Sequence, residues 1–261
     1  MRADLYLASC GYAKSRQQAK NLIESGKVVV DGAVLKKASE NIDESLPHKV
    51  ELTETDKFVG RGGLKLEGAL EKFGIDVTNF VAVDIGASTG GFTDCLLQRG
   101  AKRVYAVDSG HDQLAGKLRE DNRVVNIEGF NARRLCDGIA EGLPTDADIA
   151  VMDVSFISQT YILPGIPRLL REGGYYVGLV KPQFEAGRSA VGKNGIVKNK
   201  KYHIFALRQV IASAYAAGFG CVGLMRSPIE GGDGNTEYLA AFILGHKCEM
   251  PTDKELSAVV Q

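Results

Sequence analysis

Seven apolar runs recur between residues 80 and 245, and they constrain the fold of this chain more than any other feature. They read FVAVDIG, RVYAVD, RVVNIEG, DIAVMDVS, YYVGLVK, GFGCVGLMRS and EYLAAFILG, and stretches with helical periodicity separate them. Strands that are apolar on both faces are typical of a parallel sheet covered by helices on both sides. The sequence therefore predicts an α/β fold with a doubly wound, mostly parallel sheet, and the last run is a candidate antiparallel insertion.

Charged residues stand at the ends of several of these expected strands. Sheets of this kind bind ligands at the carboxyl ends of their strands, where Asp84, Asp108, Asp153 and Lys181 are found. A lysine is unfavourable in a buried position unless it is paired, and the following Pro182 has no N–H to donate to the sheet. Lys181 is therefore either a solvated strand end or a reagent placed at a ligand site.

The charge of the chain is balanced overall but uneven along its length. Thirty-two basic and 32 acidic residues cancel, so affinity for nucleic acid would have to come from local patches. Residues 1–37 carry a surplus of four positive charges, and residues 181–208 carry a surplus of six. Both segments are therefore candidate nucleic-acid contacts.

Cysteine content and hydropathy exclude several classes of protein. The five cysteines are scattered without a C-x-x-C pair, so we expect neither a disulfide framework nor a metal site, and a cytoplasmic location. No apolar run reaches the roughly 18 residues that a membrane span needs. We therefore expect no stable association with membranes.

The N-terminal segment predicts a small α+β module. Apolar spacing indicates two short helices, the second with Ser15 as N-cap and Gly26 at its end, and KVVVDGAVLKK reads as a hairpin about an Asp-Gly turn. The order S-R-x-x-A-x-x-x-I-x-x-G-x-V-x-V-x-G resembles S4 RNA-binding domains, and the resemblance implies such a domain over residues 1–58. It implies that the basic face contacts folded RNA through Arg16, Lys20, Lys36 and Lys37. The alternative is that these cations only solvate the surface of a small domain.

A glycine-rich stretch separates this module from the rest of the chain. Residues 59–64 contain Gly60, Gly62 and Gly63 and are expected to form a hinge. Residues 65–247 are then the large sheet domain, and residues 248–261 a C-terminal tail.

The loop after the first expected strand carries a glycine pattern, VAVDIGASTGGFTDCLLQRG. It lacks the G-x-G-x-x-G of dinucleotide folds, and its D-x-G-x-x-x-G instead resembles the S-adenosylmethionine loop of class I methyltransferases, which have a Rossmann-like fold. A carboxylate before the turn suits a ligand whose amino-acid end is cationic. The resemblance implies a cofactor site at Asp84, Gly86, Ser88, Gly90, Gly91 and Phe92.

Later strand ends extend the expected cofactor site. A carboxylate at Asp108 can accept hydrogen bonds from ribose hydroxyls, in NAD proteins as in S-adenosylmethionine proteins. Asn131, in EGFNARRL, is either an adenine contact or simply the N-cap of a helix. Asp153 completes the expected cofactor-binding set.

Four polar residues match the Lys-Asp-Lys-Glu tetrad of FtsJ-type ribose 2'-O-methyltransferases: Lys65, Asp153, Lys181 and Glu237. Each also has a simpler interpretation. Lys65 could be an exposed helix residue and Asp153 a helix cap. Lys181 could be a solvated strand end and Glu237 a charge at the edge of the sheet. A ribose hydroxyl is a poor nucleophile, so its proton must be removed by a base. An ordinary lysine, with a pKa of about 10.4, stays protonated, whereas burial and nearby cations disfavour the charged amine. By the family pattern, Lys181 is the base and the other three residues position it and the ribose.

The order of S4 domain, glycine hinge and methyltransferase resembles the hemolysin A (TlyA) family of ribosomal RNA methyltransferases. This implies S-adenosylmethionine-dependent 2'-O-methylation of cytidine in ribosomal RNA or ribosomal subunits. The chain has no tryptophan, so a linker role inferred from the tryptophans of some family members does not transfer.

The loop FEAGRSAVGKNGIVKNKK is expected to be a mobile flap that contacts phosphate through Arg188 and Lys193, or else a solvated connection. Two other functions remain as alternatives. One is a membrane-active cytolysin, which the family name suggests but no amphipathic insertion helix supports. The other is a non-catalytic S4-type assembly factor, against which the intact tetrad argues.

Overall fold

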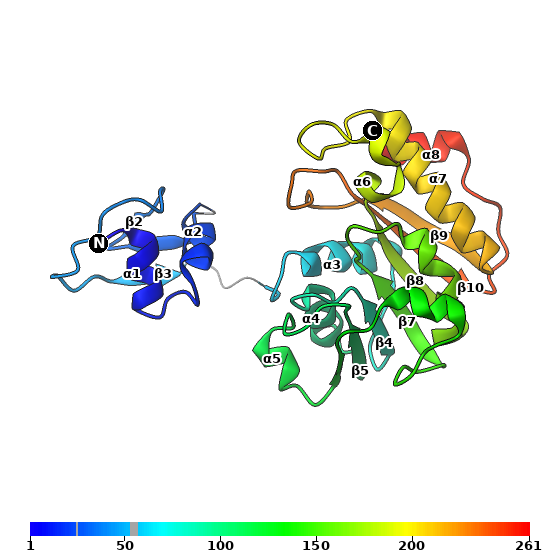
Figure 1. The fold of residues 1–261 in the computed structure, drawn as a ribbon, viewed down its shortest axis with the longest axis horizontal. Coiled ribbons are helices and arrows are strands. Elements are labelled where there is room, and N and C mark those ends of the chain that lie inside the picture. Colours follow the sequence, from blue (N-terminus) through cyan, green and yellow to red (C-terminus); the bar gives the residue numbers. More distant parts are fainter. Residues whose placement is uncertain (25, 53–56) are drawn as a thin grey trace. The chain divides into compact units, whose positions relative to one another are not determined.

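A computed structural model describes residues 1–24, 26–52 and 57–261 of the chain (Figure 1). The chain divides into two compact units, Met1–Lys57 and Phe58–Gln261. The division falls one residue before the expected end of the first domain, because the side chain of Phe58 is buried in the core of the second unit. Residues 53–56, which the sequence assigns to the first domain, lie outside the described part of the chain.

The first unit contains two helices and a three-stranded antiparallel sheet. The helices are α1 (Ala3–Ser9) and α2 (Arg16–Glu24), and the strands β1 (Val28–Val30), β2 (Ala33–Val34) and β3 (Val50–Leu52) lie in the order β2-β1-β3. Ser15 Oγ accepts a hydrogen bond from the backbone N–H of Gln18, as expected of an N-cap. Asp31 and Gly32 have φ angles of 51° and 83°, which close the tight hairpin. The expected small α+β module is confirmed.

The second unit is built on a seven-stranded sheet in the order β6-β5-β4-β7-β8-β10-β9. Its strands are β4 (Val81–Ile85), β5 (Arg103–Val107), β6 (Val124–Ile127), β7 (Ala147–Met152), β8 (Leu170–Val180), β9 (Phe219–Arg226) and β10 (Tyr238–Leu244). Strands β4 to β8 pair in parallel, whereas β10 is antiparallel to both β8 and β9. The mostly parallel sheet and the antiparallel insertion are therefore as the apolar runs predict.

Helices cover both faces of this sheet (Figure 1). One core joins the sheet to α3 (Gly62–Phe73), α4 (Gly91–Gln98) and α5 (Gly116–Arg119). The other joins it to α7 (Lys200–Ala216), α8 (Asp253–Val260) and the 3₁₀ helices η1 (Ala132–Asp137) and η3 (Leu163–Leu169). Ala82 and Val83, neighbours in β4, are buried in opposite cores. This is why the strands are apolar at nearly every position.

The expected hinge and tail both belong to the second unit. The backbone N–H of Val59 donates to Asp94 Oδ2 on α4 at 2.8 Å, and Gly62 already begins α3. At the other end, α8 buries Leu256 and Val260 in the core next to α7. A capping box between Thr252 and Glu255 starts this helix, so the C-terminal segment is a packed element instead of a tail.

Candidate active site

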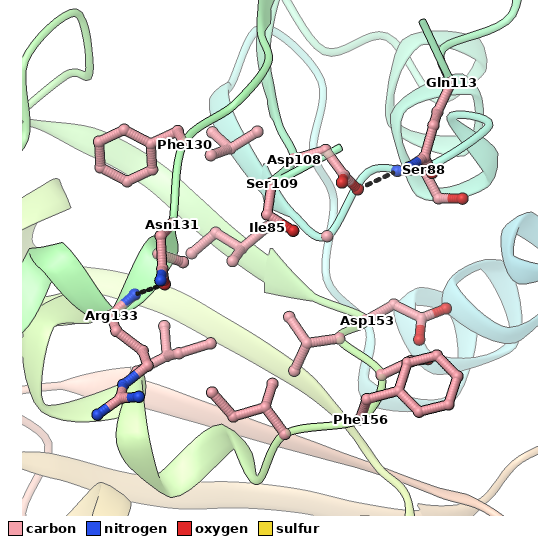
Figure 2. A pocket seen from close by; sticks show the side chains of 17 residues that line it. Ile85, Ser88, Asp108, Ser109, Gln113, Phe130, Asn131, Arg133, Asp153 and Phe156 are labelled. Atoms are coloured by element: carbon pink, nitrogen blue, oxygen red, sulfur yellow. Dashed lines mark hydrogen bonds between the residues drawn. The ribbon is translucent and has the colours of Figure 1, made fainter. Parts of the chain in front are cut away.

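A cavity of about 560 Å³ opens at the carboxyl ends of β4, β5 and β7 (Figure 2). Its polar wall comes from the loops that follow these strands and includes Ser88, Asp108, Ser109, Gln113, Asn131 and Asp153. Its apolar wall comes from Ile85, Val107, Phe130, Ile157 and Ile162. A pocket of this kind, apolar with a few placed polar groups, suits a small ligand with a flat base and a polar end.

Glycines allow the loop between β4 and α4 to approach its neighbours closely. Gly86 has φ 83°, and a Cβ there would lie 2.7 Å from the backbone oxygen of Asp153. Gly90 has φ 96°, and a Cβ there would lie 2.2 Å from the side chain of Leu118. Any other residue at these two positions would be both strained and blocked.

Backbone N–H groups orient the carboxylate of Asp108. It accepts hydrogen bonds from Ser88 N at 2.8 Å and from Gly110 N at 2.7 Å, one at each oxygen. Figure 2 shows this carboxylate at the cavity wall opposite Asn131. Asn131 Oδ1 accepts from Arg133 N at 3.1 Å, so this residue caps η1 and lines the cavity as well. The two interpretations of Asn131 are therefore compatible.

Asp84 is placed differently from the other expected cofactor contacts. It is fully buried at the end of β4, where Oδ2 accepts from Thr93 Oγ1 at 2.6 Å, and it lines neither this cavity nor the smaller one beside it. Among the described residues Oδ1 has no hydrogen-bond partner. Burial raises the pKa of Asp84 to about 7, and the negative charges of Asp153 and Asp108 act in the same direction.

The smaller cavity, of about 180 Å³, connects the cofactor loop to the catalytic candidates. It shares Gly86, Ser88, Asp153 and Ser155 with the larger one. Its remaining lining includes Gly62, Ala87, Thr89, Gly91, Phe92 and Lys181. Gly86, Ser88, Gly91 and Phe92 of the expected cofactor loop thus meet Lys181 in one place, whereas Asp84 and Gly90 do not line this cavity.

The four tetrad candidates form two ion pairs. Lys181 Nζ lies 2.6 Å from Asp153 Oδ1, and Lys65 Nζ lies 2.5 Å from Glu237 Oε2. Lys65, Lys181 and Glu237 are each less than 10% exposed. Removing one partner from a buried ion pair leaves an uncompensated charge and destabilises the protein, so the two side chains of each pair depend on each other.

The topology brings these residues to one edge of the sheet. Tyr238 of β10 pairs with Val180 of β8, so Glu237 and Lys181 are the next residues on two adjacent strands. Lys65 lies one turn after Gly62 on α3, and a Cβ on Gly62 would lie 3.5 Å from Asp153 Oδ2. Lys65 on α3 and the residues next to the ends of β7, β8 and β10 therefore lie at the same edge of the sheet, and two of the four, Asp153 and Lys181, line the smaller cavity.

Several of the expected RNA contacts already have partners within their own unit. In the first unit, Arg16 lies 3.0 Å from Asp4, and Lys20 lies 3.7 Å from Glu24. The hydrogen bonds from Arg2 and Arg16 hold the pKa of Asp4 well below its usual value. Glu40 accepts from the backbone N–H groups of Lys36 and Lys37, which fixes the loop that carries their side chains. Arg188 and Lys193 are exposed in the second unit.

The structure adds residues that the sequence analysis did not select. Ser155 Oγ accepts a hydrogen bond from Lys181 Nζ at 2.8 Å, and Gln113 and Ser109 line the larger cavity. Ser155 follows Asp153 by two residues, and that position after a strand end was the signal that could have found it. In the described ranges there is no cluster of three metal-ligating side chains. None of the described helices is long and apolar enough to cross a membrane.

The donor set fits S-adenosylmethionine. Asp108 is held by two N–H groups with lone pairs left for ribose hydroxyls, and the apolar wall can enclose an adenine. The carboxylate of Asp153, which borders both cavities, suits the cationic methionine end of the cofactor.

Comparison with known proteins gives the family. Residues 58–243 match the model of the FtsJ-like methyltransferases, and residues 1–46 match that of the S4 domain. The chain is 45% identical over 245 residues to "Hemolysin A" of Brachyspira hyodysenteriae, covering 94% of this chain and 100% of that protein. It is 40% identical over 257 residues to "16S/23S rRNA (cytidine-2'-O)-methyltransferase TlyA" of Mycobacterium tuberculosis, covering 98% and 92%.

Comparison with a solved structure agrees with this family assignment. A Streptococcus thermophilus protein, named as a candidate hemolysin, superposes with a TM-score of 0.76 at 44% identity and covers 100% of this chain and 94% of that one. The chain therefore belongs to the hemolysin A (TlyA) family, whose members join an S4 domain to an S-adenosylmethionine-dependent FtsJ-like methyltransferase.

Proposed function

We propose that this enzyme methylates the 2'-hydroxyl of a cytidine in ribosomal RNA, with Lys181 as the base. The observation that carries the proposal is the presence of two ion pairs at one edge of the sheet, Lys181 with Asp153 and Lys65 with Glu237, the first of which lines the smaller cavity. Support for the substrate comes from the Mycobacterium tuberculosis relative, whose name specifies cytidine 2'-O-methylation of 16S and 23S rRNA. A substrate of this kind would place the enzyme in the cytoplasm.

The bound cofactor supplies an electrophilic methyl group on a sulfonium. With that cofactor bound, the methyl group would move from the sulfonium to the ribose 2'-oxygen, and the proton of the hydroxyl would pass to Lys181 Nζ. For this transfer the amine must be neutral when the hydroxyl arrives, and its position must be fixed. Asp153 holds that amine at 2.6 Å, and the Lys65–Glu237 pair secures the neighbouring wall.

The basic S4 module suits the proposed substrate. Arg16, Lys20, Lys36 and Lys37 all lie in this small unit, and cations that neutralise phosphates give affinity without reading sequence. Arg188 and Lys193 are exposed cations of the methyltransferase unit itself. We assign these residues to phosphate contacts.

The direct test uses purified ribosomal subunits from cells that lack the protein. The subunits are incubated with the enzyme and methyl-labelled cofactor, and the RNA is digested to nucleosides. The label should appear in 2'-O-methylcytidine. Label on a base, or none from a folded enzyme that binds the cofactor, would contradict the proposal.

Lys181→Arg is the sharper variant. Arginine keeps the positive charge but cannot accept a proton at ordinary pH, so single-turnover methylation of saturating RNA should fall by about 10² to 10⁴. Cofactor affinity, measured by calorimetry, should stay close to wild type. Lys201→Arg, on the exposed start of α7, is the matched control. A near-normal rate for Lys181→Arg would reduce Lys181 to a phosphate contact.

A further inference from the structure

Ser155 lies where the cofactor cavity meets the catalytic lysine. It follows β7 at Asp153-Val154-Ser155, and it lines both the 560 Å³ cavity and the 180 Å³ cavity. Its Oγ accepts a hydrogen bond from Lys181 Nζ at 2.8 Å. The tetrad pattern does not include this serine, although it contacts the same amine as Asp153 does.

The hydrogen bond between Ser155 and Lys181 limits the directions in which the lysine amine can point its lone pair. A neutral amine has two N–H bonds and one lone pair, and it rotates readily about its bond to Cε. Ser155 Oγ accepts a hydrogen bond from this amine at 2.8 Å, whereas Asp153 Oδ1, 2.6 Å from Nζ, is a charge partner that accepts no hydrogen bond among the described residues. The hydrogen bond to Ser155 limits rotation about the Cε–Nζ bond and leaves the lone pair two tetrahedral directions, and the negative charge of Asp153 disfavours the direction that faces its carboxylate.

Asp153 alone would not achieve this. Its carboxylate is a charge partner of the amine, but without a hydrogen bond it does not fix the rotation about the Cε–Nζ bond. The ring of Phe184, whose centroid is 5.9 Å from Nζ, is too distant to accept a hydrogen bond in place of the serine. The hydroxyl of Ser155 therefore supplies the directional constraint.

We propose that Ser155 is a positioning residue, whose hydroxyl aims the lone pair of Lys181 at the ribose 2'-hydroxyl. The inference rests on the proposed role of Lys181 as base. After proton transfer the ammonium still donates to Ser155 Oγ, so the same hydrogen bond holds the amine before and after the step. Ser155 itself takes up no proton.

The test is single-turnover methylation of saturating RNA by Ser155→Ala, at saturating cofactor. The rate should fall about tenfold to a hundredfold, while the affinities for cofactor and RNA stay within about twofold of wild type. Ser155→Thr, which restores a hydroxyl, should recover most of the rate. Ser213→Ala on α7, which lines neither cavity, serves as control.

The outcomes separate this inference from the proposed function. A wild-type rate for Ser155→Ala beside an inert Lys181→Ala would overturn the role of Ser155 and leave Lys181 as base. A weakened cofactor affinity with a normal rate at saturation would make Ser155 a cofactor contact and also overturn it. A threonine variant as slow as the alanine variant, with unchanged affinities, would show that the hydroxyl is not the cause. A near-normal rate for Lys181→Arg would instead show that Lys181 is not the base, and the inference about Ser155 would then lose its premise.

Discussion

A single carboxyl group, that of Asp84, links the cofactor loop to the stability of the sheet domain. It is fully buried at the end of β4, and its pKa is raised to about 7, chiefly because burial penalises the charged form. The hydrogen bond from Thr93 opposes the shift without cancelling it. Between pH 4 and pH 7 the folded protein therefore holds a proton that the unfolded chain releases.

This predicts a particular pH dependence for Asp84→Asn. For a raised pKa, the contribution to the free energy of unfolding is complete below the unfolded value of 3.8 and is lost as pH rises to about 7. The stability of wild type relative to Asp84→Asn should therefore fall across this window, by at most about 4 kcal/mol, and level off above it. Denaturant unfolding of both proteins at a series of pH values measures the difference. Asp146→Asn, an exposed substitution, is the control, and parallel curves for Asp84→Asn would refute the shift.

Among single residues, those at strand ends were predictable, and their pairings were not. Asp153 and Lys181 follow apolar runs, and the rule for parallel sheets places such residues at one edge. The pairing of Lys65 with Glu237 joins residues 172 positions apart, and no local pattern carries that information. The burial of Asp84 away from the cavities likewise depends on the packing of Thr93, which only the folded loop fixes.

At the scale of elements, the segment between α6 (Pro182–Glu185) and α7 is tied down. The sequence predicts a mobile flap, but Asn235 Oδ1 accepts from Val197 N at 3.1 Å and Asn235 Nδ2 donates to Gly195 O at 2.9 Å. His203 Nε2 also lies 2.8 Å from Val197 O, and burial lowers the pKa of this histidine. The glycines and the lack of periodicity indicate a loop correctly. They cannot show that a buried asparagine 38 residues later anchors it.

Asn235→Ala should loosen this segment. The substitution leaves Val197 N and Gly195 O without their side-chain partner at a site that is 1% exposed, which should destabilise the segment by about 1 to 3 kcal/mol. Hydrogen exchange of peptides that cover residues 190–199 should become correspondingly faster. Asn194→Ala, an exposed change in the same segment, gives the baseline. Equal exchange in both variants would mean that other contacts hold the segment.

The sequence pattern at the start of helix α8 indicates a helix, although the sequence analysis assigned this segment to a tail. Thr252 and Glu255 form a capping box, and Leu256 and Val260 follow at helical spacing. Because only two of its residues are buried, the apolar pattern is too short to distinguish a helix packed on the core from a polar C-terminal tail.

At the scale of the whole molecule, the two units are joined through a segment that belongs to the second. Phe58 is 3% exposed, and a Cβ on Gly63 would lie 2.3 Å from its ring, so this aromatic fills space that Gly63 leaves open. The S4-like segment and the glycines that follow it predicted two domains and a glycine-rich junction. It could not show that the junction packs into the larger core, because that depends on Gly63 facing Phe58.

Two fragments test this packing. Residues 58–261 should unfold at the same denaturant concentration as the methyltransferase unit of the full chain, because the fragment retains the whole core. Residues 61–261, which lack Phe58 and the Val59–Asp94 hydrogen bond, should be less stable by about 2 to 4 kcal/mol. Circular dichroism during denaturation measures both. Equal midpoints for the two fragments would show that the junction adds nothing to the core.

The position of β10 between β8 and β9 makes activity depend on synthesis beyond residue 237. Of the described strands it comes last in the sequence, yet it fills the gap between two strands made earlier, and it is immediately preceded by Glu237. A chain released before residue 237 would leave Lys65 without its carboxylate and two strand edges unpaired. Open edges promote aggregation. Chains that end before residue 237 would thus be both catalytically defective and prone to aggregation, so that functional enzyme comes only from chains that extend through β10.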